Sequence, residues 1–88
     1  KNMIYQVKPE FTPGTEIYSL NNLGTINSYF VSRVLFSGKD DGCSINILIT
    51  YVIVNDKHQT ITTIDAEELK RRFFLDKKDI VKHIVEHI

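Results

Sequence analysis

The chain has 88 residues with 42% hydrophobic and 25% charged side chains, and its 11 basic residues balance its 11 acidic ones. This length suits one domain with a small core, so we treat residues 1–88 as a single unit, and the composition excludes an intrinsically disordered chain. The formal net charge of zero excludes a general attraction to nucleic acid or acidic membranes, so binding to either would need a local charged patch.

Two strands are predicted in the first 37 residues. Pro13 and Gly14 form a turn in the motif FTPGTEIYSL, and apolar and polar side chains then alternate from Glu16 to Leu20. A longer strand is predicted over residues 25–37, where the apolar side chains occupy even positions. We expect these even positions to face the core: Ile26, Phe30, Val34 and Phe36.

The segment from Cys43 to Val54 is the strongest strand candidate. Its odd positions form an unbroken apolar row, and its even positions begin polar and become apolar toward Val54. The second half is therefore expected to be buried on both faces. Cys43 is expected to be buried as the first member of the inward row. After a turn at 55–58, a fourth strand is predicted over residues 59–64.

The chain changes character after the fourth strand, where helix signals replace strand signals. Asp65 and Glu68 have the spacing of a capping box, which predicts a short helix. The segment RRFFL, residues 71–75, is either a short final strand or the hinge between the two helices. Asp76 predicts the cap of a last helix with one apolar stripe, which we expect to cover the second face of the third strand. The stripe consists of Ile80, Val81, Ile84, Val85 and Ile88.

This order of elements resembles the SH3-like barrels. The motif FTPGTEIYSL is similar to the entry into their first strand, and ITTIDAEEL is similar to their fourth strand and short helix. The segment FFLDKKDIVKHI is similar to the C-terminal helix of small barrel proteins from phages, prophages and gut bacteria. The resemblance supplies no catalytic residue.

The resemblance implies a mainly β (α+β) fold. It implies an SH3-like small barrel of four to five antiparallel strands over residues 11–75, with a short helix and a C-terminal amphipathic helix over residues 76–88. The alternative fold is a plain α+β sheet with both helices packed on one face.

A basic cluster between residues 70 and 82 is the candidate site for an anion or a nucleic acid. Six cations against two carboxylates, Asp76 and Asp79, give a local net charge of +4. Phe73 and Phe74 lie among the cations, as is typical of single-strand binding surfaces. The alternative is that both rings belong to the core and the charges form a solvated rim. The cluster consists of Lys70, Arg71, Arg72, Lys77, Lys78 and Lys82.

Tyr18 and Tyr29 are the candidate contacts for a protein or peptide partner. Both are opposite in parity to the apolar side chains of their strands, and tyrosine is enriched at interfaces. Tyrosine is also a favourable strand residue, so a purely structural role is the alternative. His83 and His87 are four residues apart on the last helix, but two ligands make a weak metal site. A solvated helix face explains them better, and we expect no metal and no cofactor.

The sequence contains no pattern typical of an enzyme, such as a nucleophile elbow, paired carboxylates or a phosphate-binding glycine loop. We therefore expect a non-catalytic binding or accessory module with a protein as its partner, and the resemblance to small barrel proteins implies a phage or bacterial origin. Nucleic acid bound by the basic cluster is the alternative, and self-association is a further expectation. A single cysteine, no visible secretion signal and no apolar run of ~20 residues predict a cytoplasmic protein without a membrane segment.

Overall fold

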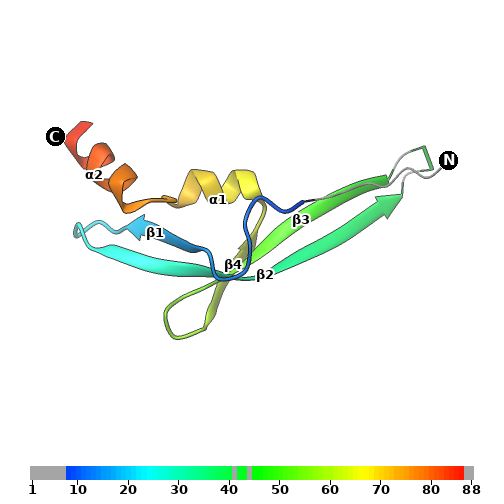
Figure 1. The fold of residues 1–88 in the computed structure, drawn as a ribbon, viewed down its shortest axis with the longest axis horizontal. Helices are drawn as coiled ribbons and strands as arrows, with labels where there is room; N and C mark the ends of the chain where they lie inside the picture. The colour runs from blue at the N-terminus through cyan, green and yellow to red at the C-terminus, as the bar shows by residue number, and fades with distance from the viewer. Residues whose placement is uncertain (1–7, 41, 44, 87–88) are drawn as a thin grey trace.

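The computed structural model describes residues 8–40, 42–43 and 45–86 (Figure 1). Its strands form one antiparallel sheet in the order β1-β2-β3-β4, and two helices follow the last strand. The elements are β1 (Glu16–Leu20), β2 (Ile26–Asp40), β3 (Ile45–Val54), β4 (Thr60–Ile64), α1 (Ala66–Arg72) and α2 (Lys77–Glu86). This confirms the predicted mainly β fold with a short helix and a C-terminal helix.

The four-stranded sheet is open, so the predicted closure into a barrel is not confirmed. The segment between the helices does reach the free edge of β1. The backbone N–H of Tyr18 donates to the carbonyl of Phe74 (2.9 Å), and the N–H of Phe74 donates to the carbonyl of Tyr18 (2.7 Å). Of the segment predicted over residues 71–75, residues 71 and 72 belong to α1, and the rest forms a hinge that also pairs with β1 at Phe74.

A bulge in β2 changes which side chains of that strand face the core. Val31 pairs with Ile53 and Arg33 pairs with Val52, so Ser32 is an extra residue on the β2 side. An extra residue shifts every later side chain by one position relative to the partner strand. The prediction that even positions of β2 face the core is therefore wrong before the bulge, where Val31 is buried, and holds only after it.

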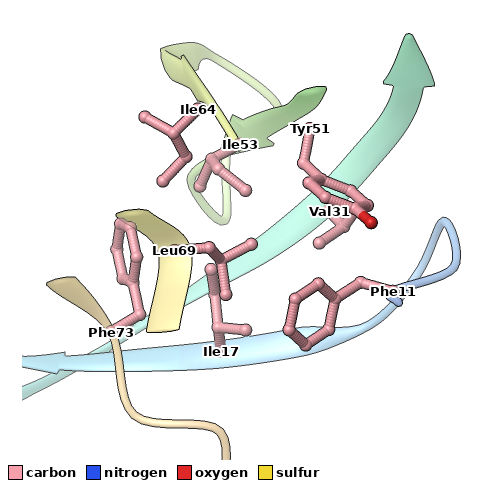
Figure 2. Packing of buried hydrophobic residues seen from close by; sticks show 8 residues of the cluster. All are labelled: Phe11, Ile17, Val31, Tyr51, Ile53, Ile64, Leu69 and Phe73. Carbon is pink, nitrogen blue, oxygen red and sulfur yellow. The ribbon is translucent and has the colours of Figure 1, made fainter. Parts of the chain in front are cut away.

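The core lies between the sheet and α1 (Figure 2). Leu69 of α1 is 0% exposed, and Phe73 at the end of the helix is buried beside it. Both belong to one apolar cluster with side chains from every strand. The cluster consists of Phe11, Ile17, Val31, Tyr51, Ile53, Ile64, Leu69 and Phe73.

The prediction that the last helix covers the third strand is wrong. Pairing of Phe74 with β1 directs α2 toward the β1 end of the sheet, away from β3 (Figure 1). Only Ile80 of α2 is buried, and the other described members of the apolar stripe are exposed. These exposed members are Val81, Ile84 and Val85; Ile88 lies outside the described residues.

Aspartate side chains cap both helices as predicted. Asp65 Oδ1 accepts the N–H of Glu68 (2.9 Å) at the start of α1, and Asp76 Oδ1 accepts the N–H of Lys78 (2.9 Å) at the start of α2. The reciprocal half of the predicted capping box is replaced by an ion pair, because the Glu68 carboxylate contacts Arg71 at 3.3 Å.

Burial changes sharply along β3. The second half, from Tyr51 to Val54, is buried on both faces as predicted, whereas Ile45 and Ile47 in the first half are exposed. Cys43 precedes the strand and is exposed, so the prediction that it begins a buried row is wrong.

The molecule is elongated because β2 and β3 run beyond their neighbours. Its radius of gyration is 16.2 Å, against about 12 Å for a compact chain of this length. β1 pairs with residues 26–30 of β2, and β4 pairs with residues 51–54 of β3. The rest of the hairpin projects as a two-stranded arm, which we define as residues 35–40 and 45–50 (Figure 1).

Candidate functional site

The predicted basic cluster is divided between two helices, and most of its cations already have partners. Lys70 forms an ion pair with Glu10 (2.7 Å), and Arg71 forms one with Glu68 (3.3 Å). The Arg72 guanidinium lies 5.7 Å from the centre of the neighbouring Phe73 ring.

The cations of α2 complete this picture. The Lys77 ammonium lies 5.5 Å from the centre of the Tyr18 ring. Lys78 and Lys82 are exposed and make neither an ion pair nor a ring contact with the part of the chain that the structure describes. Only these two of the six cations therefore offer an uncommitted charge to an anionic ligand.

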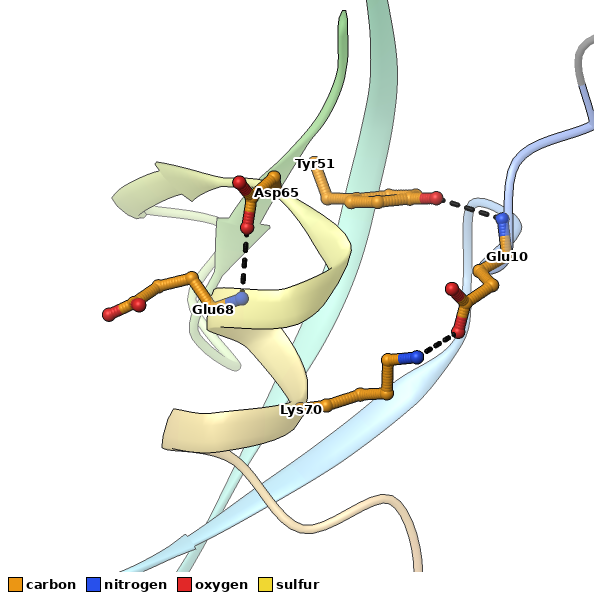
Figure 3. Close-up of polar contacts among 5 residues, drawn as sticks. All are labelled: Glu10, Tyr51, Asp65, Glu68 and Lys70. Carbon is orange, nitrogen blue, oxygen red and sulfur yellow. Dashed lines mark hydrogen bonds and ion pairs between the residues drawn. The ribbon is translucent and has the colours of Figure 1, made fainter.

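The Lys70–Glu10 pair has a structural role that the sequence did not indicate (Figure 3). The backbone N–H of Glu10 donates to the hydroxyl oxygen of buried Tyr51 (2.9 Å), and the Glu10 carboxylate accepts from Lys70 on α1. This carboxylate raises the pKa of Lys70, an effect that partial desolvation of the ammonium opposes. The two contacts hold the segment before β1 against both β3 and α1.

Tyr18 and Tyr29 are both half-buried and both contact other parts of the chain. The Tyr18 hydroxyl donates to Glu16 (2.9 Å), and this hydrogen bond is the main reason why the pKa of Tyr18 is raised. The Tyr29 ring meets the Phe73 ring edge-on, with ring centres 5.5 Å apart. The bulge in β2 explains this, since it places Tyr29 on the core face together with Val31.

The structure offers no support for a metal site in residues 8–40, 42–43 and 45–86, where no three His, Cys, Asp or Glu side chains gather. The His83 ring lies against Phe74, with ring centres 5.6 Å apart. The other histidine of the predicted pair, His87, lies outside the described residues. Neither described helix is both long and apolar enough to cross a lipid bilayer.

The largest group of exposed apolar side chains in the described chain lies on the arm, which the sequence did not single out. Paired residues of antiparallel strands share a face, so Phe36 with Ile49, Gly38 with Ile47, and Asp40 with Ile45 lie on one side. We call this side the apolar face of the arm, which consists of Phe36, Gly38, Ile45, Ile47 and Ile49, with Asp40 at the tip. The opposite side, the polar face of the arm, includes Leu35, Ser37, Asn46, Leu48 and Thr50.

The apolar face of the arm continues the core face of the sheet. Val34 and Ile49 pack against the core cluster, and beyond them Phe36, Ile47 and Ile45 become exposed. Phe36 is 55% exposed and Ile45 is 68% exposed. Antiparallel sheets normally bury one face and leave the other in water. The outer arm therefore has the side-chain pattern of a half-buried sheet, but residues 8–40, 42–43 and 45–86 provide no layer that would bury it.

Element lengths were the signal in the sequence that could have revealed this surface. A helix of 7 residues is about 10 Å long, whereas a strand of 10 residues spans about 33 Å. Such a helix covers only part of β3.

No protein-family model, curated protein or solved structure matches this chain. The candidate site is therefore defined by its own chemistry, an exposed apolar sheet face with one aromatic side chain.

Proposed function

We propose that this protein is a small, non-catalytic protein-binding module that binds its partner through the apolar face of the arm. The observation that carries the proposal is the exposure of Phe36, Ile45 and Ile47 on one continuous sheet face. Large exposed apolar patches on small proteins are typical of interaction sites, and aromatic side chains are enriched at their centres.

The lack of charge on this face supports a protein rather than a nucleic acid as the partner. Asp40 is the only ionisable residue that the register places on the apolar face, and it lies at the tip. A phosphate backbone is bound by cations, which this face does not offer. A strand or an apolar surface of another protein fits it better.

The resemblance to SH3-like barrels gives this proposal its fold context. The pairing of Phe74 with β1 after a short helix supports it, because the end of the chain there returns to the first strand. We accordingly retain an SH3-like module of phage or bacterial origin, acting as an accessory protein, as part of the proposal.

Affinity capture with matched variants tests the protein-binding function. Phe36→Ser removes an aromatic side chain from the apolar face, and Leu48→Ser removes a side chain of similar exposure, 53% against 55%, from the polar face. A protein captured from lysate of the source cell by wild type and by Leu48→Ser, but not by Phe36→Ser, supports binding through the apolar face. Equal capture by all three chains contradicts it.

Nucleic-acid binding is the second candidate function, and the exposure of Lys78 and Lys82 on α2 favours it. These residues are four apart and lie on neighbouring turns of one helix face. Charge reversal of both lysines would then abolish a salt-sensitive mobility shift of DNA or RNA. No shift of the wild-type protein at low salt would exclude this function.

A further inference from the structure

The apolar face of the arm lacks a covering layer within the described chain. Near the core, α1 and Phe11 cover the same face of β3, since Leu69 and Phe11 share a cluster with Tyr51. Farther out, both helices lie away from the arm (Figure 1). A two-stranded hairpin alone is only marginally stable in water. The arm is therefore suited to a partner that supplies a second apolar layer.

The shape of this face is suited to packing against itself. Phe36 projects from the face, and Gly38, two residues farther along β2, has no side chain. A Cβ atom built at Gly38 would meet no atom within 4 Å, so the face is open there. A twofold axis across two antiparallel arms places each Phe36 toward the partner's open position. Such an isologous contact uses one surface twice and closes after two subunits.

Charge also allows self-association. The formal net charge of the chain is zero, so a second copy is not repelled at long range. Asp40 lies at the end of the apolar face, so an antiparallel arrangement keeps the two Asp40 side chains at opposite ends of the contact.

The molecule exposes more surface than a compact monomer of its mass. The accessible surface is 6914 Å² for a mass of 10.2 kDa. A compact monomer of this mass exposes about 5,300 Å², which leaves an excess of roughly 1,600 Å². An interface of standard size buries about 800 Å² on each partner.

We propose that the partner of the apolar face is a second copy of this chain, and that two arms pack face to face, antiparallel, about a twofold axis. This inference rests on the proposed protein-binding function and names its partner. Phe36 and Ile47 form the centre of the contact, and Gly38 of each subunit receives Phe36 of the other.

Sedimentation velocity from roughly 1 µM to 1 mM tests this inference. The experiment is run under reducing conditions, because the exposed Cys43 could otherwise cross-link two chains. Wild type is expected to change from monomer to dimer within this range. Since a twofold contact loses both copies of a mutated side chain, Phe36→Ser should raise the dimer Kd about 100-fold. The control Leu48→Ser should change it less than about threefold.

The variant Gly38→Val tests the same contact in case Phe36→Ser fails to fold. The backbone of Gly38 is not left-handed, so valine is compatible with the strand and should not destabilise the monomer. Its side chain occupies the open position and should raise the Kd about tenfold or more. Lower dimer affinity in a chain that is at least as stable as wild type cannot be explained by unfolding.

The outcomes separate this inference from the proposed function. A wild-type monomer at the highest concentration overturns the inference, and so does a dimer that Phe36→Ser and Gly38→Val leave unchanged. Another outcome is a monomeric wild type that still captures a protein which Phe36→Ser does not capture. In that case the inference fails and the protein-binding function stands. If the wild type is monomeric and captures no protein, both fail.

Discussion

The two halves of β3 have similar side chains and opposite environments. Both halves are rich in isoleucine, leucine and valine, yet Ile53 is fully buried and Ile45 is largely exposed. The difference comes from their neighbours. The inner half pairs with both β2 and β4 and lies under α1, while the outer half, among the described residues, pairs only with β2. An apolar strand pattern thus shows which side chains are able to be buried, whereas the surrounding layers determine which of them are.

The largest expected effect compares one leucine from each region. Leu69→Ala removes a fully buried side chain from the core and should lower the free energy of unfolding by about 2–5 kcal/mol. Leu48→Ala on the polar face of the arm should lower it by about 1 kcal/mol or less, because half of that side chain is already in water. Urea denaturation of both variants measures the difference. Similar losses of unfolding free energy in the two variants would mean that the arm contributes as much to stability as α1 does.

The helix caps allow a sharper comparison, between α1 inside the core and α2 at its margin. Asp65→Ala should lower the free energy of unfolding by about 1 kcal/mol, because α1 carries Leu69 into the core. Asp76→Ala removes an equivalent cap from α2, which contributes no residue to the main core cluster. Asp76→Ala should reduce the far-ultraviolet circular dichroism signal of the helices. It should shift the urea midpoint less than Asp65→Ala does. A larger midpoint shift for Asp76→Ala than for Asp65→Ala would reverse the proposed importance of the two helices.

The smallest expected effect concerns the contact between Glu10 and Lys70 at the edge of the core. The Glu10 carboxylate raises the folded pKa of Lys70 above its usual 10.5. The stabilisation is therefore fully present below pH 10.5 and is lost as the pH rises through the folded pKa. Both side chains are about half exposed, so the effect should be smaller than that of Asp65→Ala.

Melting temperatures across this alkaline range test the pair. The hydrogen bond to Glu16 raises the pKa of Tyr18 in the same direction, so wild type should lose stability from both groups. Lys70→Met should weaken the pH dependence of the melting temperature. The control Lys78→Met should not, because Lys78 is exposed and forms no ion pair with the described residues. Identical pH profiles for the two variants would contradict the stabilising role assigned to the ion pair between Glu10 and Lys70.

The sequence by itself determined the order and type of the elements. Alternation located the strands, and the side-chain oxygens of Asp65 and Asp76 located the starts of both helices, because these signals act over a few neighbouring residues. The sequence also identified the buried inner half of β3, where apolar side chains occupy both faces.

Only the tertiary structure decided how those elements combine. The bulge at Ser32 brought Tyr29 to the core face, and a single pairing between Phe74 and Tyr18 placed α2 away from β3. The partners of Lys70 and Lys77 likewise come from distant segments. The exposure of the arm also depends on where β1, β4 and α1 end in space, which no local pattern of side chains encodes. Burial is a property of the neighbours that the fold supplies, and for Phe36 and Ile45 the described chain supplies no covering layer.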